Sequence, residues 1–302
     1  MNRIMRNVRF TLLVCLMPLF SSCEKAFEQN SVTEKDANVV IRIADFQQLS
    51  FEDTVDGRKM MTTRSAVSLS DYCDYLQFVV FDETEKLSSM NQKVGDEGYG
   101  HAAMKIAPGS YTLMVLAHKA PSYATVSSLT KVTFPGNQVG DTFLYCGAIT
   151  VEDNKQNTFN VTLGRCVSMF RLCVEDNLPD DVAKMKFYYT GGSSTLDAST
   201  GWGNVNSRQT VNFDISAADR GGPAVFEVFT FPHEEYSDLK MTVTALDAQG
   251  QTLCEKIFEK VPIQRNRITQ YKGVFFGSGQ TSDSHITVAG DTAWTVHQTV
   301  AY

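Results

Sequence analysis

The side chains that most often do chemistry in proteins are few and scattered in this chain of 302 residues. Its five histidines stand at positions 101, 118, 233, 285 and 297, and no two of them have the spacing of paired metal ligands. The sequence lacks the G-x-S-x-G elbow, the H-E-x-x-H zinc motif and the glycine-rich loops that bind phosphates. We therefore predict a protein that is not an enzyme, with no catalytic residue, metal or cofactor.

Two acidic segments carry oxygen atoms that a cation could use as ligands. His233 is followed by two glutamates in FPHEEY, and FDETEK (81–86) holds three acidic side chains. Neither has the Asp/Gly pattern of a calcium loop. The first is therefore expected to be an exposed acidic loop between strands, and the second a solvated hairpin tip.

A cysteine near the N-terminus is the strongest candidate for covalent chemistry. The first ten residues contain Arg3, Arg6 and Arg9 and no acid, and the apolar block FTLLVCLMPLF follows them. This block has the length of a secretory signal and is too short to span a bilayer. Two serines, the second of them Ser22, then lead into Cys23.

This order resembles the lipobox of bacterial lipoproteins, although Phe20 replaces the usual leucine. The resemblance implies a signal peptide over residues 1–22, cleavage between Ser22 and Cys23, and acyl chains such as palmitate on Cys23. Several acyl chains anchor a protein far more firmly than one. Glu24 implies sorting to the outer membrane. The alternative is an ordinary signal peptide with an incidental cysteine.

The composition of the chain limits the classes of binding partner that are expected. The formal charge is −7, and removal of a signal with three arginines would take it to −10. Nucleic acid is therefore not an expected partner, because no basic block is present to neutralise phosphates. Five cysteines lie beyond Cys23, an odd number without close spacing, and we expect them to be buried free thiols: Cys73, Cys146, Cys166, Cys173 and Cys254.

The rest of the chain consists of short β-branched and aromatic segments separated by turn residues. These segments must form the elements that position any functional site. In TFNVTLGR, Phe159, Val161 and Leu163 alternate with polar residues, which predicts a half-buried strand. Similar patterns predict strands in NVVIRIADF, YLQFVVFDE, GSYTLMVLAH, KMKFYYTGG, AVFEVFTFP, LKMTVTALD and QYKGVFFG. Many short strands with little helix indicate an all-β sandwich architecture.

Four parts are predicted along the chain. A tether over 23–35 follows the signal, and the boundary between an N-terminal domain (36–164) and a C-terminal domain (165–302) falls in LGRCVSMF. Helical turns are expected only in APSYATVSSLT and SAADRGG, and a last two-strand unit is expected in HITVAGDTAWTVHQTVAY. Trp202 lies between glycines in a long loop, where its ring could stack on a sugar or plug the edge of a sandwich.

One segment, KVPIQRNRITQYKGVFF (260–276), is more specific. Together with the lipobox cysteine, YLQFVVFDE, IAPGSYTLMVLAHK and FNVTLGRCVSMFRLCVEDNLPDDV, it resembles the FimB-type fimbrial-anchoring lipoprotein family of type V fimbriae, over residues 36–277. The resemblance implies two tandem transthyretin-like Greek-key β-sandwiches. It also implies a cell-adhesion protein at the fimbrium base that fixes fimbriae to the outer membrane or limits their length.

In this interpretation the partners are the outer membrane, through lipid, and fimbrial shaft subunits, through β-strand addition at an edge strand. The strands around residues 294–302 are a candidate for that junction. Two alternatives remain. Cleavage between Arg64 and Ser65 by an arginine-specific protease would instead make the chain a shaft or tip subunit. A surface lipoprotein that binds glycans or a host protein near Trp202 is the other.

Overall fold

The computed structural model describes residues 36–46, 53–55, 58–60, 68–220, 222–277, 285–286 and 300–301. Helix in these ranges is limited to three single 3-10 turns, at Leu69–Asp71, Pro135–Asn137 and Ala217–Asp219. Within the same ranges, no helix is long and apolar enough to cross a bilayer. The predicted signal peptide, Cys23 and the Arg64–Ser65 bond lie outside the described residues.

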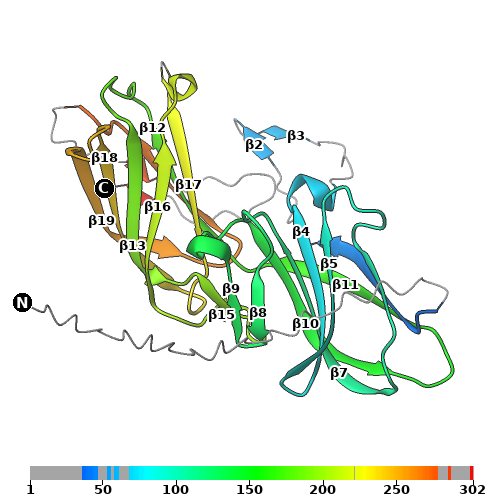
Figure 1. The fold of residues 1–302 in the computed structure, drawn as a ribbon. Helices are drawn as coiled ribbons and strands as arrows, with labels where there is room; N and C mark the ends of the chain where they lie inside the picture. Colours follow the sequence, from blue (N-terminus) through cyan, green and yellow to red (C-terminus); the bar gives the residue numbers. More distant parts are fainter. Residues whose placement is uncertain are drawn as a thin grey trace, which may run out of the picture.

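The first sandwich is one seven-stranded sheet folded into two layers (Figure 1). Its order is β5 (Glu85–Lys93), β4 (Tyr75–Asp82), β7 (Gly109–His118), β10 (Thr142–Val151), β11 (Asn157–Arg165), β1 (Val39–Phe46) and β6 (His101–Met104).

The sheet turns between β10 and β11, because these two strands pair only at Phe143–Arg165 and Leu144–Gly164. Near the connecting loop, β11 leaves β10 and pairs with β1 instead. Buried side chains of both layers then form one core, as β1, β4, β7, β10 and β11 all contribute to it. The loop VEDNKQN therefore connects one layer of the sandwich to the other. It is not the tip of a continuous hairpin.

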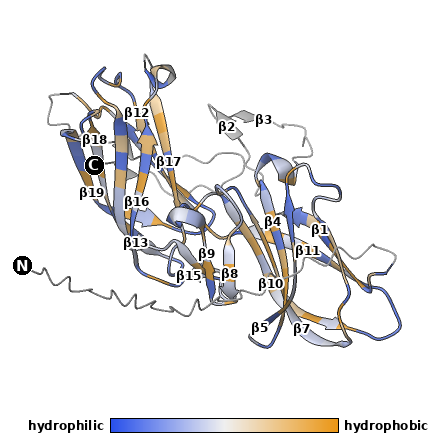
Figure 2. Cartoon of the chain, in the orientation of Figure 1, coloured by the Kyte–Doolittle hydropathy of each residue, from blue (hydrophilic) through white to orange (hydrophobic). Residues whose placement is uncertain are grey.

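Strands β4 and β7 are buried on both faces. Phe78 and Val115 point into the first core, while Phe81 and Met114 belong to a second apolar cluster on the other side of the sheet. Residues alternate sides along a strand, so a strand covered on both faces reads as a continuous apolar run. In Figure 2 orange hydrophobic segments and blue hydrophilic segments alternate along many of the strands.

A small four-stranded sheet covers that other side. It consists of β8 (Thr125–Ser128), β9 (Lys131–Thr133), β14 (Thr195–Asp197) and β15 (Trp202–Gly203). Val132 of β9 pairs with Leu196 of β14, so strands from before and after residue 165 share one ladder. The cluster beneath includes Phe134, Phe231 and Ile268, which means that the two halves of the chain share an apolar core.

The second sandwich has two sheets. One contains β17 (Ala224–Thr230), β12 (Ser168–Val174), β20 (Ile268–Gly273), β21 (His285–Ile286) and β22 (Val300–Ala301), in that order. The other contains β16 (Ser207–Asp214), β13 (Lys184–Gly192), β18 (Ser237–Leu246) and β19 (Thr252–Ile263). Aromatic side chains fill the space between them, with the ring centroids of Phe170 and Phe187 6.2 Å apart. A further pair, β2 (Asp53–Val55) and β3 (Arg58–Met60), forms a separate hairpin.

The predicted all-β, two-sandwich fold is confirmed, and most predicted strands stand where expected. The turn in SAADRGG is a 3-10 turn as predicted. The helical turn predicted in APSYATVSSLT is wrong, because Thr125–Ser128 is strand β8. Val126 is buried there and pairs with Val132, and this tertiary contact outweighs the serine-rich local pattern.

Candidate functional site at the sandwich junction

Each sandwich pairs its first strand in parallel with its last long strand. In the first, β1 runs parallel to β11, from Val39 opposite Asn157 to Phe46 opposite Leu163. In the second, β12 runs parallel to β20, from Met169 opposite Ile268 to Val174 opposite Gly273. Only two residues separate the end of β11 from the start of β12. The two parallel ladders are therefore connected in series along the backbone.

This arrangement determines how tension would act. A pull on the start of β1 and an opposite pull on the end of β11 slide the two strands past each other. All hydrogen bonds of a parallel ladder then resist together, whereas a hairpin opened at its ends loses them one pair at a time. The same geometry applies to β12 and β20, because β12 would be pulled at its start and β20 at its end.

The junction between the ladders is held by a buried ion pair. Arg165, the last residue of β11, donates from Nε to Asp141 Oδ1 at 2.7 Å and from Nη2 to Oδ2 at 2.8 Å. Its side chain is 1% exposed, and its guanidinium carbon lies 4.5 Å from the ring centroid of Phe143. Burial raises the pKa of Asp141, and the hydrogen bonds from Arg165 oppose that rise. Such a two-point contact fixes orientation as well as charge.

Asn266 connects this ion pair to the corner between β19 and β20. Arg165 Nη1 donates to Asn266 Oδ1 at 3.1 Å, and the Asn266 backbone N–H donates to the Val167 carbonyl at 2.8 Å. Asn266 has a φ of 56°, in the left-handed region that asparagine tolerates better than most residues. Two segments that contribute to the family resemblance, LGRCVSMF and QRNRIT, therefore meet at the junction.

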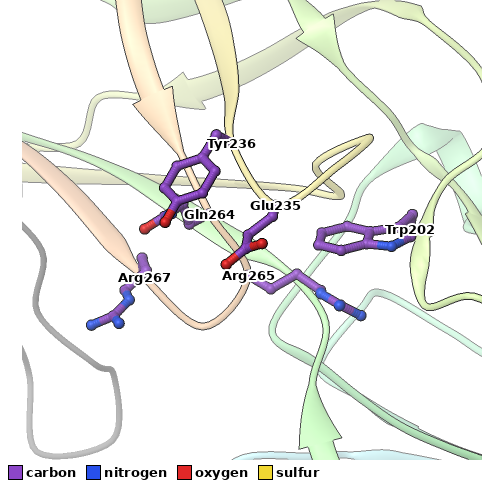
Figure 3. A pocket seen from close by; sticks show the side chains of 6 residues that line it. All are labelled: Trp202, Glu235, Tyr236, Gln264, Arg265 and Arg267. Carbon is purple, nitrogen blue, oxygen red and sulfur yellow. The ribbon is translucent and has the colours of Figure 1, made fainter.

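Beside this corner lies an open hollow of about 290 Å³ (Figure 3). Three segments contribute to it: β15, the turn before β18, and the corner between β19 and β20. Its lining is aromatic and polar: Trp202, Glu235, Tyr236, Gln264, Arg265 and Arg267.

One face of the Trp202 ring is already occupied. The guanidinium carbon of Arg265 lies 3.4 Å from the ring centroid, and Nη1 donates weakly to the carbonyls of Thr200 and Gly201. Gly201 has a φ of +75°, and a Cβ there would stand 2.7 Å from Arg265 Nη1. Trp202 is therefore a support for Arg265, and the exposed aromatic ring of the hollow is Tyr236, with 69% of its surface accessible. The sequence reasoning missed Tyr236.

The acidic segments take ordinary structural positions. Nδ1 of His233 lies 2.9 Å from the Gly203 carbonyl oxygen, which fixes the ring against β15. Asp82 pairs with Glu85 across the turn between β4 and β5, so FDETEK is the predicted hairpin tip. In the described ranges, no group of three or more His, Cys, Asp and Glu residues could hold a metal ion.

The five cysteines beyond Cys23 are all free. Cys73 and Cys166 are buried as expected, and burial raises the pKa of the Cys166 thiol to about 12. Cys146, Cys173 and Cys254 are only partly buried, which corrects the expectation for these three. In the last two-strand unit, His285–Ile286 and Val300–Ala301 pair with each other as strands.

A protein-family model and several solved structures match this chain. No curated protein matches it. Solved structures of similar shape include the fimbrial anchor protein Mfa2 from Porphyromonas gingivalis, at 9% identity and a TM-score of 0.47, covering 87% of this chain and 99% of that one. A candidate polysaccharide-binding protein from Bacteroides thetaiotaomicron has 14% identity and a TM-score of 0.47, covering 88% and 95%.

A candidate adhesin from Bacteroides ovatus has 12% identity and a TM-score of 0.46, covering 66% of this chain and 88% of that one. Similarities of this size carry no functional argument. The family model is decisive, because it matches residues 48–297, most of the sequence. It confirms the predicted fimbrial-anchor resemblance, and the chain belongs to the family of fimbrillin-A associated anchor proteins Mfa1 and Mfa2.

Proposed function

We propose that this chain is a non-enzymatic lipoprotein that anchors a fimbria to the outer membrane and limits its length. Acyl chains on Cys23 hold the membrane, residues 24–35 form the tether, and the two sandwiches carry tension to the shaft subunits. Membership of the anchor-protein family supports the fimbrial role. The residues around 294–302 contribute the strand that joins the neighbouring subunit.

The observation that carries the proposal is the pair of parallel ladders in series. The tether enters directly at β1, so force from the membrane reaches the β1–β11 ladder first. It then passes through the Arg165–Asp141 junction to β12 and β20.

Cleavage between Arg64 and Ser65 would give the alternative function. It would separate lipid and β1 from the rest of the chain. Val39 and Ile41 of β1 are fully buried between β11 and β6, so loss of the strand would expose the core and two strand edges. A protein that anchors must keep this segment, and we infer that the bond stays intact.

The test is the N-terminus and intact mass of the protein extracted from outer membranes. A chain that begins at acylated Cys23 is the expected result, and a chain that begins at Ser65 would make it a shaft or tip subunit. In cells, Cys23→Ser should release the protein and its fimbriae into the medium. Filaments of unchanged attachment and length in a deletion strain would contradict the anchoring role.

A further inference from the structure

We propose that Asp176 and Lys256 form an exit clamp, which fixes the point where the chain leaves the second sandwich and carries tension into the end of the β12–β20 ladder. This inference rests on the proposed function, because it concerns a chain under load. Asp176 follows β12 in one sheet and Lys256 lies in β19 of the other, so the clamp joins both sheets of the sandwich.

Asp176 holds two successive backbone groups. Its Oδ1 accepts a hydrogen bond from the Phe275 N–H at 2.7 Å, and its Oδ2 accepts one from the Phe276 N–H at 2.6 Å. Hydrogen bonds to a carboxylate are about twice as strong as those between neutral groups. The regular β12–β20 pairing ends at Gly273, before Phe275. Asp176 therefore extends the ladder beyond its last paired residues.

Two side chains of β19 hold the same segment from the other sheet. Lys256 Nζ donates to the Val274 carbonyl at 2.7 Å and lies 5.6 Å from the centroid of the Phe275 ring. The Cys254 thiol donates to the Phe275 carbonyl, with 3.4 Å between sulfur and oxygen. The Phe275 ring is 2% exposed and belongs to the core of this sandwich. Residues 274–276 are therefore held by both sheets and by the core between them.

The β12–β20 ladder is thus closed at both ends. At its start, the Asn266 N–H donates to the Val167 carbonyl at 2.8 Å. At its end, Asp176 accepts from Phe275 and Phe276. If β20 slides along β12, both closures must break together with the ladder, so each should slow the forced unfolding of this sandwich.

The clamp lies where a pull from the C-terminal side first meets an extended ladder. In the described part of the chain, β21 pairs with β20 at two positions and β22 pairs with β21 at two positions. A pull on the C-terminal end should detach these short pairs first and then act on Phe276. With Asp176 in place, the force loads the bonds of the parallel ladder together and does not peel β20 from its end.

The experiment is forced unfolding of the full chain at constant force, with a handle at each end. The event that belongs to the second sandwich is identified by the length of chain that it releases. Asp176→Ala should raise the rate of this event on the order of tenfold or more, because two hydrogen bonds to a carboxylate are lost. Asp176→Asn keeps the shape and should also raise the rate, because the amide nitrogen cannot accept a hydrogen bond. Lys256→Met removes one bond and should raise it less.

A control variant and a second pulling geometry separate the clamp from general packing. Asp180→Asn removes an exposed charge from the same loop and should leave the rate unchanged. Handles at Asn206 and Gln249, two exposed loop positions, load the sheet of β16, β13 and β18 instead, and there Asp176→Asn should change the rate little.

Three results would overturn the clamp. They are an unchanged rate in Asp176→Asn under end-to-end force, an equal increase in Asp180→Asn, and an equal increase in both pulling geometries. None of them would affect the anchoring role, which the N-terminus of the extracted protein and the attachment of filaments test separately. An increase confined to end-to-end force and to the variants of Asp176 and Lys256 is the expected result.

Discussion

The two parallel ladders differ in how firmly their first strands are held. The β1–β11 ladder is interrupted by an irregularity between Ile43 and Asp45, and β1 has only four partner pairs on its other side, with β6. The β12–β20 ladder is uninterrupted, and β12 has seven partner pairs on its other side, with β17. The comparison teaches that the same topology gives a weaker ladder in the first sandwich than in the second. The first sandwich should therefore yield first under tension.

The largest expected effect is a charge placed inside the weaker ladder. Ile41 is fully buried between Phe159 of β11 and Ala102 of β6. Ile41→Asp should lower the unfolding free energy by about 4 kcal/mol or more, because an unpaired charge is buried. Urea unfolding measured by tyrosine and tryptophan fluorescence checks this. Thr158→Asp, on the exposed face of β11, is the matched control and should change stability little.

The second prediction concerns the link between the two ladders. Asp141→Ala leaves the buried Arg165 guanidinium without its carboxylate and should cost about 3–5 kcal/mol. In the unaltered chain the sandwiches should unfold in a single transition, and in the variant the first should separate from the second. The exposed pair Lys184–Asp214 offers the control, and Asp214→Ala should be nearly neutral. Equal effects of the two substitutions would refute the role of the junction.

The third prediction uses acid to weaken the first sandwich selectively. His118 at the end of β7 is fully buried, stacked on Tyr75 and in edge contact with Phe134. Burial lowers its pKa from 6.5 to about 4. The unfolded chain therefore takes up the proton at higher pH, and this contribution to stability is complete above pH 6.5 and lost as the pH falls towards 4.

The amount lost over that window should be about 3 kcal/mol. Unfolding free energies at a series of pH values measure it. His118→Phe removes the titrating group while keeping a ring beside Tyr75 and Phe134, so it should flatten the pH dependence between 6.5 and 4. An unchanged slope in that variant would show that other groups cause the acid sensitivity.

The smallest expected effect lies in the second sandwich, on its solvent face. Lys240 and Glu259 form an ion pair at 3.0 Å between β18 and β19, and both side chains are more than half exposed. A double-mutant cycle should give a coupling energy below about 1 kcal/mol, which high salt reduces further. A coupling as large as that of Arg165 with Asp141 would remove the contrast between buried and exposed pairs.

Much of the fold followed from local pattern. Alternation in TFNVTLGR predicted β11, and Val161 and Leu163 are indeed buried while Thr158 and Thr162 are exposed. The apolar run YLQFVVFDE also predicted a strand, β4. The sequence could not reveal why this run is apolar on both sides. The reason is the small sheet that packs on its second face, which combines strands from distant parts of the chain.

The candidate site was less accessible from sequence. Trp202 stood out because tryptophan between glycines is rare, whereas Tyr236 is an ordinary residue of a polar turn. Only the proximity of β15 to the β19–β20 corner places Arg265 on the Trp202 ring and leaves Tyr236 exposed. These residues are more than 25 positions apart, and no periodicity connects them.

The sequence by itself determined the strand-rich class of the protein, the positions of most strands and the resemblance to fimbrial anchors, because period-two burial and motif order are local properties. The tertiary structure alone decided which strands run side by side in parallel, the contact of Arg165 with Asp141 and Asn266, and the shape of the hollow. Those features depend on how distant segments pack, and packing energy is a property of the folded chain as a whole.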